Sequence, residues 1–126
     1  MPGITYGAGA LIAAERGDRR LRALHRRALE RGLVPTVPAG VLGQGWRGGP
    51  RAQMSRLLKG CRIEPLDEAR ARSAGAACGR AASADVVDAA VVVGASSRAD
   101  LLVTSHPDDI GHLAAALGVE LRVQTI

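Results

Sequence analysis

The chain has 126 residues, about the length of one domain. Hydrophobic residues make up 47% of it and aromatic residues only 2%, so a folded core must be built from Ala, Val, Leu and Ile. Stacking of bases on aromatic rings is therefore excluded as the main binding mode. The net charge of +5 is divided unevenly, with +9 on residues 1–63 and −4 on residues 64–126.

Short strand-like runs alternate with helical stretches along the chain. The predicted strands are residues 4–6, 33–37, 61–64, 101–104 and 121–125. The predicted helices are residues 10–15, 19–31, 39–46, 51–59, 67–80, 85–93 and 106–118. This alternation predicts a single α/β domain over residues 1–126, with a mainly parallel sheet whose sites lie at the carboxyl ends of the strands.

Two acids open the most apolar of these helices. Asp85 is a helix-capping residue by type, and Asp88 is followed by Ala-Ala-Val-Val-Val, which predicts a central, buried helix. Asp85 and Asp88 are three residues apart and lie on one helix face. Clustered carboxylates repel one another unless a divalent cation neutralises them, and Mg²⁺ prefers oxygen ligands. The alternative is that Asp85 only caps the helix and Asp88 is incidental.

Several other classes of site are excluded or disfavoured. No glycine-rich loop is followed by the lysine that a phosphate-binding loop requires. Cys61 and Cys78 lack the spacing of zinc ligands, so we expect free thiols in a reducing cytoplasm. No apolar run is long enough to span a membrane, and the first residues do not read as a secretory signal.

Four segments together resemble a PIN domain, and more narrowly the VapC toxins of bacterial toxin–antitoxin pairs. The segments are Gly7–Ala13, Val37–Arg47, Asp85–Ala89 and Leu102–Asp109. The resemblance implies a three-layer α/β/α fold and a Mg²⁺- or Mn²⁺-dependent endoribonuclease. It also implies RNA as substrate, a cognate antitoxin as partner and a homodimer as the assembly.

The family's site is a quartet of acids, and this sequence departs from it. The acid that ends the first strand falls on Gly7, and the Glu of the helix after the second strand falls on Gln44. The acid of the buried helix falls on Asp88, and the acid after the fourth strand falls on His106. Only one of the four positions is acidic, which predicts weak metal binding and little nuclease activity.

Two further acids are candidates to support Asp88. Asp85 lies beside it on the helix, and Glu15 follows the first strand by one helix. A histidine at position 106 favours Mn²⁺ or Zn²⁺ over Mg²⁺. Either a natural pseudoenzyme or an inactivated toxin fits this pattern.

The helix 19–31 is covered with arginines. As candidate RNA-binding residues we single out Arg19, Arg20, Arg22, Arg26 and Arg27. The alternative is a solvated helix face. Three hypotheses therefore remain: an impaired PIN-domain ribonuclease toxin, a catalytically inactive PIN domain that binds RNA or an antitoxin, and an unrelated α/β nucleotide-binding module.

Overall fold

The computed structural model describes residues 3–126. The strands are β1 (Ile4–Tyr6), β2 (Thr36–Pro38), β3 (Arg62–Glu64), β4 (Leu101–Thr104) and β5 (Arg122–Thr125). The helices are α1 (Ala8–Glu15), α2 (Arg19–Glu30), α3 (Ala39–Gly45), α4 (Ala52–Lys59), α5 (Glu68–Ala81), α6 (Val86–Arg98) and α7 (Pro107–Leu117). The predicted elements are all present, with ends that differ by a few residues.

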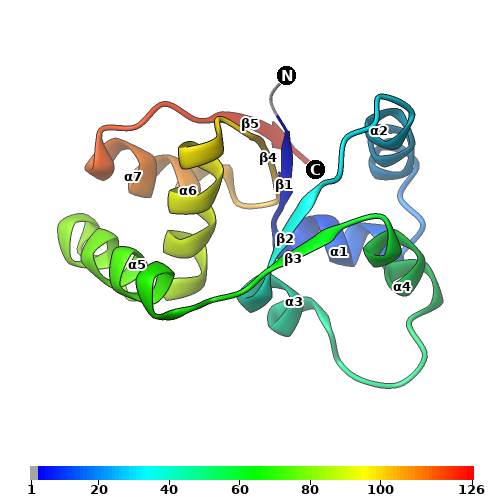
Figure 1. Cartoon of the computed structure of the whole chain (residues 1–126), viewed down its shortest axis with the longest axis horizontal. Helices are drawn as coiled ribbons and strands as arrows, with labels where there is room; N and C mark the ends of the chain where they lie inside the picture. The colour runs from blue at the N-terminus through cyan, green and yellow to red at the C-terminus, as the bar shows by residue number, and fades with distance from the viewer. Residues whose placement is uncertain (1–2) are drawn as a thin grey trace.

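The five strands form one sheet in the order β3-β2-β1-β4-β5, and every pair is parallel. Thr5 of the central strand pairs with Thr36 on one side and with Leu102 on the other. Helices α5, α6 and α7 lie on one side of this sheet, and α1, α2 and α4 lie on the other (Figure 1). The predicted three-layer α/β/α architecture is therefore confirmed.

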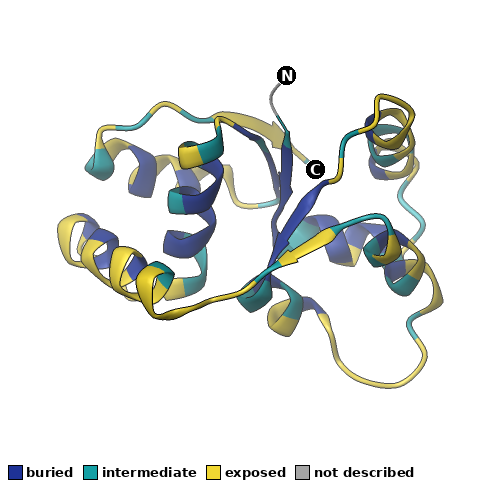
Figure 2. Cartoon of the chain, viewed as in Figure 1, coloured by how far each residue is buried: buried dark blue, intermediate teal, exposed yellow. Residues whose placement is uncertain are grey.

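The core runs through β1, β4 and α6 (Figure 2). Leu102 and Val103 in β4 are fully buried, as are Val92 and Ala95 in α6. This confirms the expectation of a central, buried helix, and small side chains allow α6 to pack closely on its neighbours. Among residues 3–126, no helix combines the length and the apolar character that crossing a bilayer requires.

The second strand is shorter than predicted, and its start is displaced. The expected strand 33–37 begins only at Thr36, and Val34 is 63% exposed. Pro35 has no backbone N–H and cannot donate to the sheet ladder, and the N–H of Leu33 donates instead to the carbonyl oxygen of Ala28 at the end of α2. At the other end the strand extends to Pro38, one residue beyond the prediction.

The position of His25 differs from the one that the sequence predicts. Its place on the arginine-rich helix predicts a solvent-facing side chain, but the ring is half-buried and its Nδ1 lies 2.9 Å from the hydroxyl of Tyr6. Tyr6 is fully buried at the end of β1. Burial lowers the pKa of His25 below its ordinary value. The only tyrosine of the chain thus finds its hydrogen-bond partner on α2.

The buried β4 strand provides a direct test of this core. Replacing Leu102 by Ala removes a fully buried side chain between β1 and β5, and we expect a loss of about 3 kcal/mol in the free energy of unfolding. Urea denaturation measures this loss. The matched variant Leu66→Ala, at a side chain that is 42% exposed, should change stability by less than about 1 kcal/mol. Equal losses at the two positions would contradict the described core.

Candidate functional site

A cleft of about 410 Å³ opens at the carboxyl ends of β1 and β4. We call it the acid cleft. Its lining comes from the first turns of α1, α6 and α7 and from the end of α3. The lining residues are Gly7, Ala8, Gly9, Ile12, Gln44, Arg47, Asp85, Asp88, Val91, Leu102, Thr104, His106, Asp109 and Ile110.

All four positions that the resemblance singled out line this cleft. Gly7 follows β1, Gln44 ends α3, Asp88 lies in the first turn of α6 and His106 follows β4. They are far apart in the sequence, but parallel strands bring their carboxyl ends to the same edge of the sheet. The structure thus brings together the residues chosen by motif, while their chemical roles stay predictions.

Three residues of the cleft lining lie at helix starts. Gly7, Asp85 and His106 are the N-cap residues of α1, α6 and α7. The carboxylate of Asp85 accepts a hydrogen bond from the backbone N–H of Asp88 at 2.9 Å, as a capping acid does. Gly7 and His106 make no side-chain capping hydrogen bond, so two of the three helices begin without a cap.

The capping geometry at Gly7 would suit an acid. Its backbone is extended, with φ −83° and ψ 175°, which any residue can adopt. A Cβ added there would lie 3.2 Å from the carbonyl oxygen of Val103, so a small adjustment is needed. The dihedral angles at this position are therefore compatible with an aspartate, provided that the backbone of β4 shifts by a few tenths of an ångström.

Asp88 carries the strongest electrostatic signature of the cleft. Its pKa is raised from 3.8 to about 6, mainly by burial and next by the neighbouring Asp85, which acts both by its charge and through a side-chain hydrogen bond. Asp109 acts in the same direction and His106 opposes it. The carboxylates therefore repel one another in a partly desolvated site.

The acids that remain do not fit a divalent cation. Within residues 3–126, no three or more His, Cys, Asp or Glu side chains are arranged to hold a metal ion. Mg²⁺ needs near-octahedral coordination and gains its affinity from charged oxygen ligands. Because Gly7 and Gln44 contribute no charge and His106 contributes a nitrogen, the donor set falls short of what Mg²⁺ prefers.

Glu15 lies outside the acid cleft. It ends α1, and an eight-residue helix separates it from Gly7 by about 12 Å. Its carboxylate instead accepts a hydrogen bond from the backbone N–H of Met54 at 2.8 Å, in the first turn of α4. Glu15 thus supplies the N-terminal hydrogen bond that α4 lacks from its own N-cap residue Arg51, which is a structural role.

The candidate RNA-binding arginines also lie away from the acid cleft. They are all on α2, and two of them, Arg22 and Arg26, line a separate hollow of about 350 Å³ between α2 and α4. We call this hollow the α2–α4 groove. The cation that does line the acid cleft is Arg47, whose guanidinium donates to the carbonyl oxygens of Gly43 and Trp46. Nothing in the local sequence pattern predicts that placement.

The comparisons define the class of fold. No protein-family model matches the chain, and no curated protein sequence does. Among solved structures, the chain is similar to the crystal structure of VapBC2 from Rickettsia felis bound to a DNA fragment from their promoter. The TM-score is 0.67 with 12% sequence identity, and the match covers 98% of each chain. The chain therefore has a PIN-like α/β fold of the VapC kind.

The raised pKa of Asp88 predicts a pH-dependent stability. The folded-state value of about 6 exceeds the ordinary 3.8, so ionised Asp88 destabilises the fold above pH 6, and this effect disappears as the pH falls toward 4. The shift corresponds to at most about 3 kcal/mol, and partial exposure reduces the expected effect to about 1–2 kcal/mol.

The variant Asp88→Asn should therefore raise the free energy of unfolding by about 1–2 kcal/mol at pH 7.5 and by much less at pH 4. Urea denaturation at both pH values measures the difference. This variant keeps the backbone N–H of residue 88 that donates to Asp85, so the capping hydrogen bond does not contribute to the measured difference in stability. A gain that is the same at both pH values would contradict the described electrostatics.

Proposed function

We propose that the chain is the toxin component of a VapBC-type toxin–antitoxin pair, a PIN-domain endoribonuclease whose metal site is impaired. The observation that carries this proposal is the meeting of Gly7, Gln44, Asp88 and His106 in one cleft at the carboxyl edge of a PIN-like fold. These positions come from four separate segments, so a chance match of short motifs would not bring them together.

The resemblance implies Mg²⁺ or Mn²⁺ as the cofactor and RNA as the substrate. A divalent ion in such a site would supply an activated water and would stabilise the charge of a cleaved phosphodiester. Asp88 and Asp85 line the acid cleft and are the acids that would bind such an ion, and Arg47, which lines the same cleft, would contact a phosphate. Because the other family acids are missing, we expect weak metal binding and little cleavage as the sequence stands.

A second candidate function follows from the misfit of the metal site. A PIN domain that no longer cleaves RNA can still bind RNA or an antitoxin and sequester it. The described residues lack a metal-binding group of three ligands, while the α2–α4 groove is lined by apolar and basic side chains. An RNA cleavage assay of a variant with the missing acids restored distinguishes an impaired nuclease from a domain that only binds.

The α2–α4 groove is the surface that best fits an antitoxin segment. Its apolar contacts come from Ala14, Leu29 and Leu57, and its basic contacts come from Arg22, Arg26 and Arg56. Among residues 3–126, Glu30 is the only acid that lines it. This combination is complementary to an amphipathic segment that carries aliphatic side chains flanked by carboxylates. We propose an acidic, amphipathic segment of the cognate antitoxin as its occupant.

Restoring two acids should restore the nuclease. In the double variant Gly7→Asp/His106→Asp, three acids of the family quartet would line the acid cleft, and each new aspartate would also occupy an N-cap position. We expect Mn²⁺-dependent cleavage of single-stranded RNA that is at least tenfold above the starting chain. Gel electrophoresis of a labelled RNA measures the cleavage.

The matched control for this experiment is Gly7→Asn/His106→Asn, which has nearly the same shape and no added charge. It should cleave no more RNA than the starting chain. The triple variant that adds Asp88→Asn to the two aspartates should lose the gain. If the double aspartate variant stays folded and shows no Mn²⁺-dependent cleavage, the impaired-nuclease proposal fails and the binding function is favoured.

Charge reversal in the groove tests the antitoxin proposal. The variant Arg22→Glu/Arg26→Glu should weaken binding of the proposed cognate antitoxin by at least tenfold, because like charges would then face its acidic segment. Isothermal titration calorimetry on the purified proteins measures the affinity. Arg19→Glu/Arg27→Glu is the matched control, since these arginines lie on the same helix but do not line the groove. Equal weakening by both pairs would contradict the groove as the docking site.

A further inference from the structure

One side of α2 carries a row of arginines that do not line the α2–α4 groove. Arg20, Arg27 and Arg31 follow one another at intervals of seven and four residues, which places them on one helix face over about 16 Å. All three are exposed, and so is Arg16 at the end of α1. We call Arg16, Arg20, Arg27 and Arg31 the arginine track.

The positive charge of the track is not matched by acids. Residues 15–31 contain seven arginines and three acids, a net charge of +4. The three acids have other partners: Glu15 bonds to the backbone of α4, Asp18 caps α2, and Glu30 pairs with Arg26. Among the described residues, no arginine of the track forms an ion pair. The track is therefore free to attract an anionic partner.

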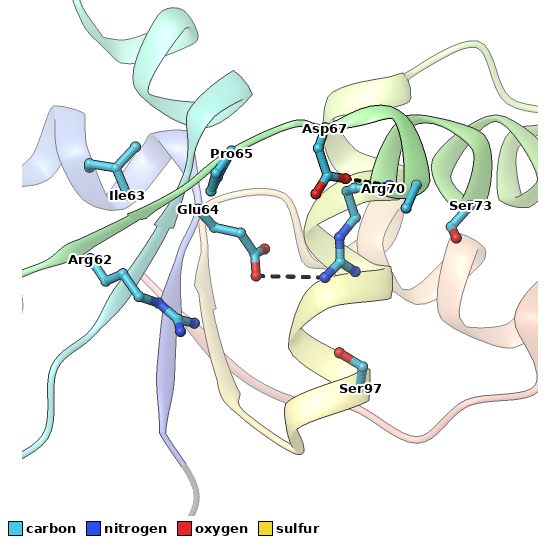
Figure 3. A pocket seen from close by; sticks show the side chains of 9 residues that line it. Arg62, Ile63, Glu64, Pro65, Asp67, Arg70, Ser73 and Ser97 are labelled. Carbon is cyan, nitrogen blue, oxygen red and sulfur yellow. Dashed lines mark hydrogen bonds and ion pairs between the residues drawn. The ribbon is translucent and has the colours of Figure 1, made fainter.

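The arginines around β3 are different, because they are compensated within the fold. The carboxylate of Glu64 lies between Arg62 and Arg70, and the guanidinium of Arg70 is 3.6 Å from it (Figure 3). Glu64 also pairs with Arg98, which donates a second hydrogen bond to Asp100. The unpaired positive charge thus lies on α2 rather than at this edge of the sheet.

The track begins beside the acid cleft, although the body of α2 packs away from it. The guanidinium of Arg20 donates a hydrogen bond to the backbone carbonyl oxygen of Thr125 at 3.2 Å, where β5 ends. Thr125 pairs with Thr104 of β4, and Thr104 lines the acid cleft. Arg20 therefore reaches the strand end next to the one that forms the cleft.

Helix α1 connects the cleft to the track in a second way. Ile12 lines the acid cleft, and its side chain is 45% exposed. Arg16, the C-cap residue of α1, follows Ile12 by four residues, so both lie on one helix face, about 6 Å apart along the axis. Two separate elements thus bring arginines of the track to the margin of the cleft.

From this unpaired charge that begins at the cleft, we infer that the arginine track binds the phosphates of a single-stranded RNA that leaves the acid cleft. The inference rests on the proposed function, since it takes RNA as the substrate of the cleft. Guanidinium groups bind phosphate oxygens through paired N–H donors. Arg20 uses one of its five N–H groups on Thr125, so the others remain available to a phosphate while this bond fixes the side chain. Phosphate contacts also suit a chain with only 2% aromatic residues, which has few rings on which bases can stack.

Fluorescence anisotropy of a labelled 12-nucleotide oligo(U), titrated with the chain without divalent ions, tests this inference. Arg20→Gln/Arg27→Gln should weaken the affinity at least tenfold. The slope of log K against log salt concentration should fall in magnitude by about 1.4, because each lost contact to a single strand removes about 0.7. The control Arg72→Gln/Arg80→Gln removes the same charge from exposed positions of α5, on the other side of the sheet. It should weaken the affinity by less than about twofold and leave the slope unchanged.

Thermal melting shows whether each variant is folded, and a second variant keeps the test informative. Among the described residues, the side chains of Arg16 and Arg27 make no hydrogen bond or ion pair, so Arg16→Gln/Arg27→Gln removes no stabilising contact of this kind. It should weaken oligo(U) binding by a similar factor. A 12-base-pair DNA duplex is titrated in parallel. If it binds more than tenfold tighter than oligo(U) with the same dependence on these arginines, the partner is duplex DNA and the inference is overturned.

This assay measures binding alone, so its result is independent of the cleavage assay proposed for Gly7→Asp/His106→Asp. Weakened binding by the track variants supports the track even if that double variant cleaves no RNA, in which case only the nuclease proposal fails. The inference is overturned, even if cleavage is restored, when oligo(U) does not bind or when the track variants bind it as tightly as the starting chain. Equal weakening by the α5 control would overturn it too.

Discussion

The parallel pairing of β1 with β2 on one side and β4 on the other is the constraint on which the structure depends. Because all strands point the same way, the residues that follow β1 and β4 are carried to one edge of the sheet. The chain leaves β1 toward β2 on one side and returns through α6 to β4 on the other. This reversal opens the acid cleft between Gly7 and His106.

The same geometry makes the cleft sensitive to the loss of acids. The first turns of α1, α6 and α7 all face it, and helix N-termini stabilise negative charge. An aspartate at each N-cap would satisfy a helix end and add a charge for a cation. In this chain only α6 keeps such an acid, in Asp85, and its effect is to raise the pKa of Asp88 further. The remaining carboxylates therefore repel one another.

The candidate site was predictable from sequence where a residue directly follows a strand or opens a helix. Gly7, Asp88 and His106 are of this kind, and their meeting follows from the parallel sheet alone. Glu15 was assigned by its nearness in sequence to the first strand, but the length of α1 carries it out of the cleft. The arginines of α2 are predicted to bind RNA because of their charge. Charge does not indicate where a helix packs against the sheet, and α2 lies away from the acid cleft. Arg47 lies just after the glycine-rich helix α3 and lines the cleft. No local sequence pattern specifies the direction in which the chain leaves this helix.

By itself, the sequence determined the alternation of strands and helices, the buried character of α6 and the residue types at the ends of the strands, where Gly7 and His106 stand instead of acids. These properties depend on local periodicity and residue type, so they can be read without coordinates. Only the tertiary structure decided that His25 turns inward to Tyr6, that Glu15 supports α4, and that Arg62, Arg70 and Arg98 gather around Glu64. Each of these contacts joins distant segments, and its free energy depends on burial and distance. Local pattern contains neither quantity, because both arise only when the sheet and its two helical layers have packed together.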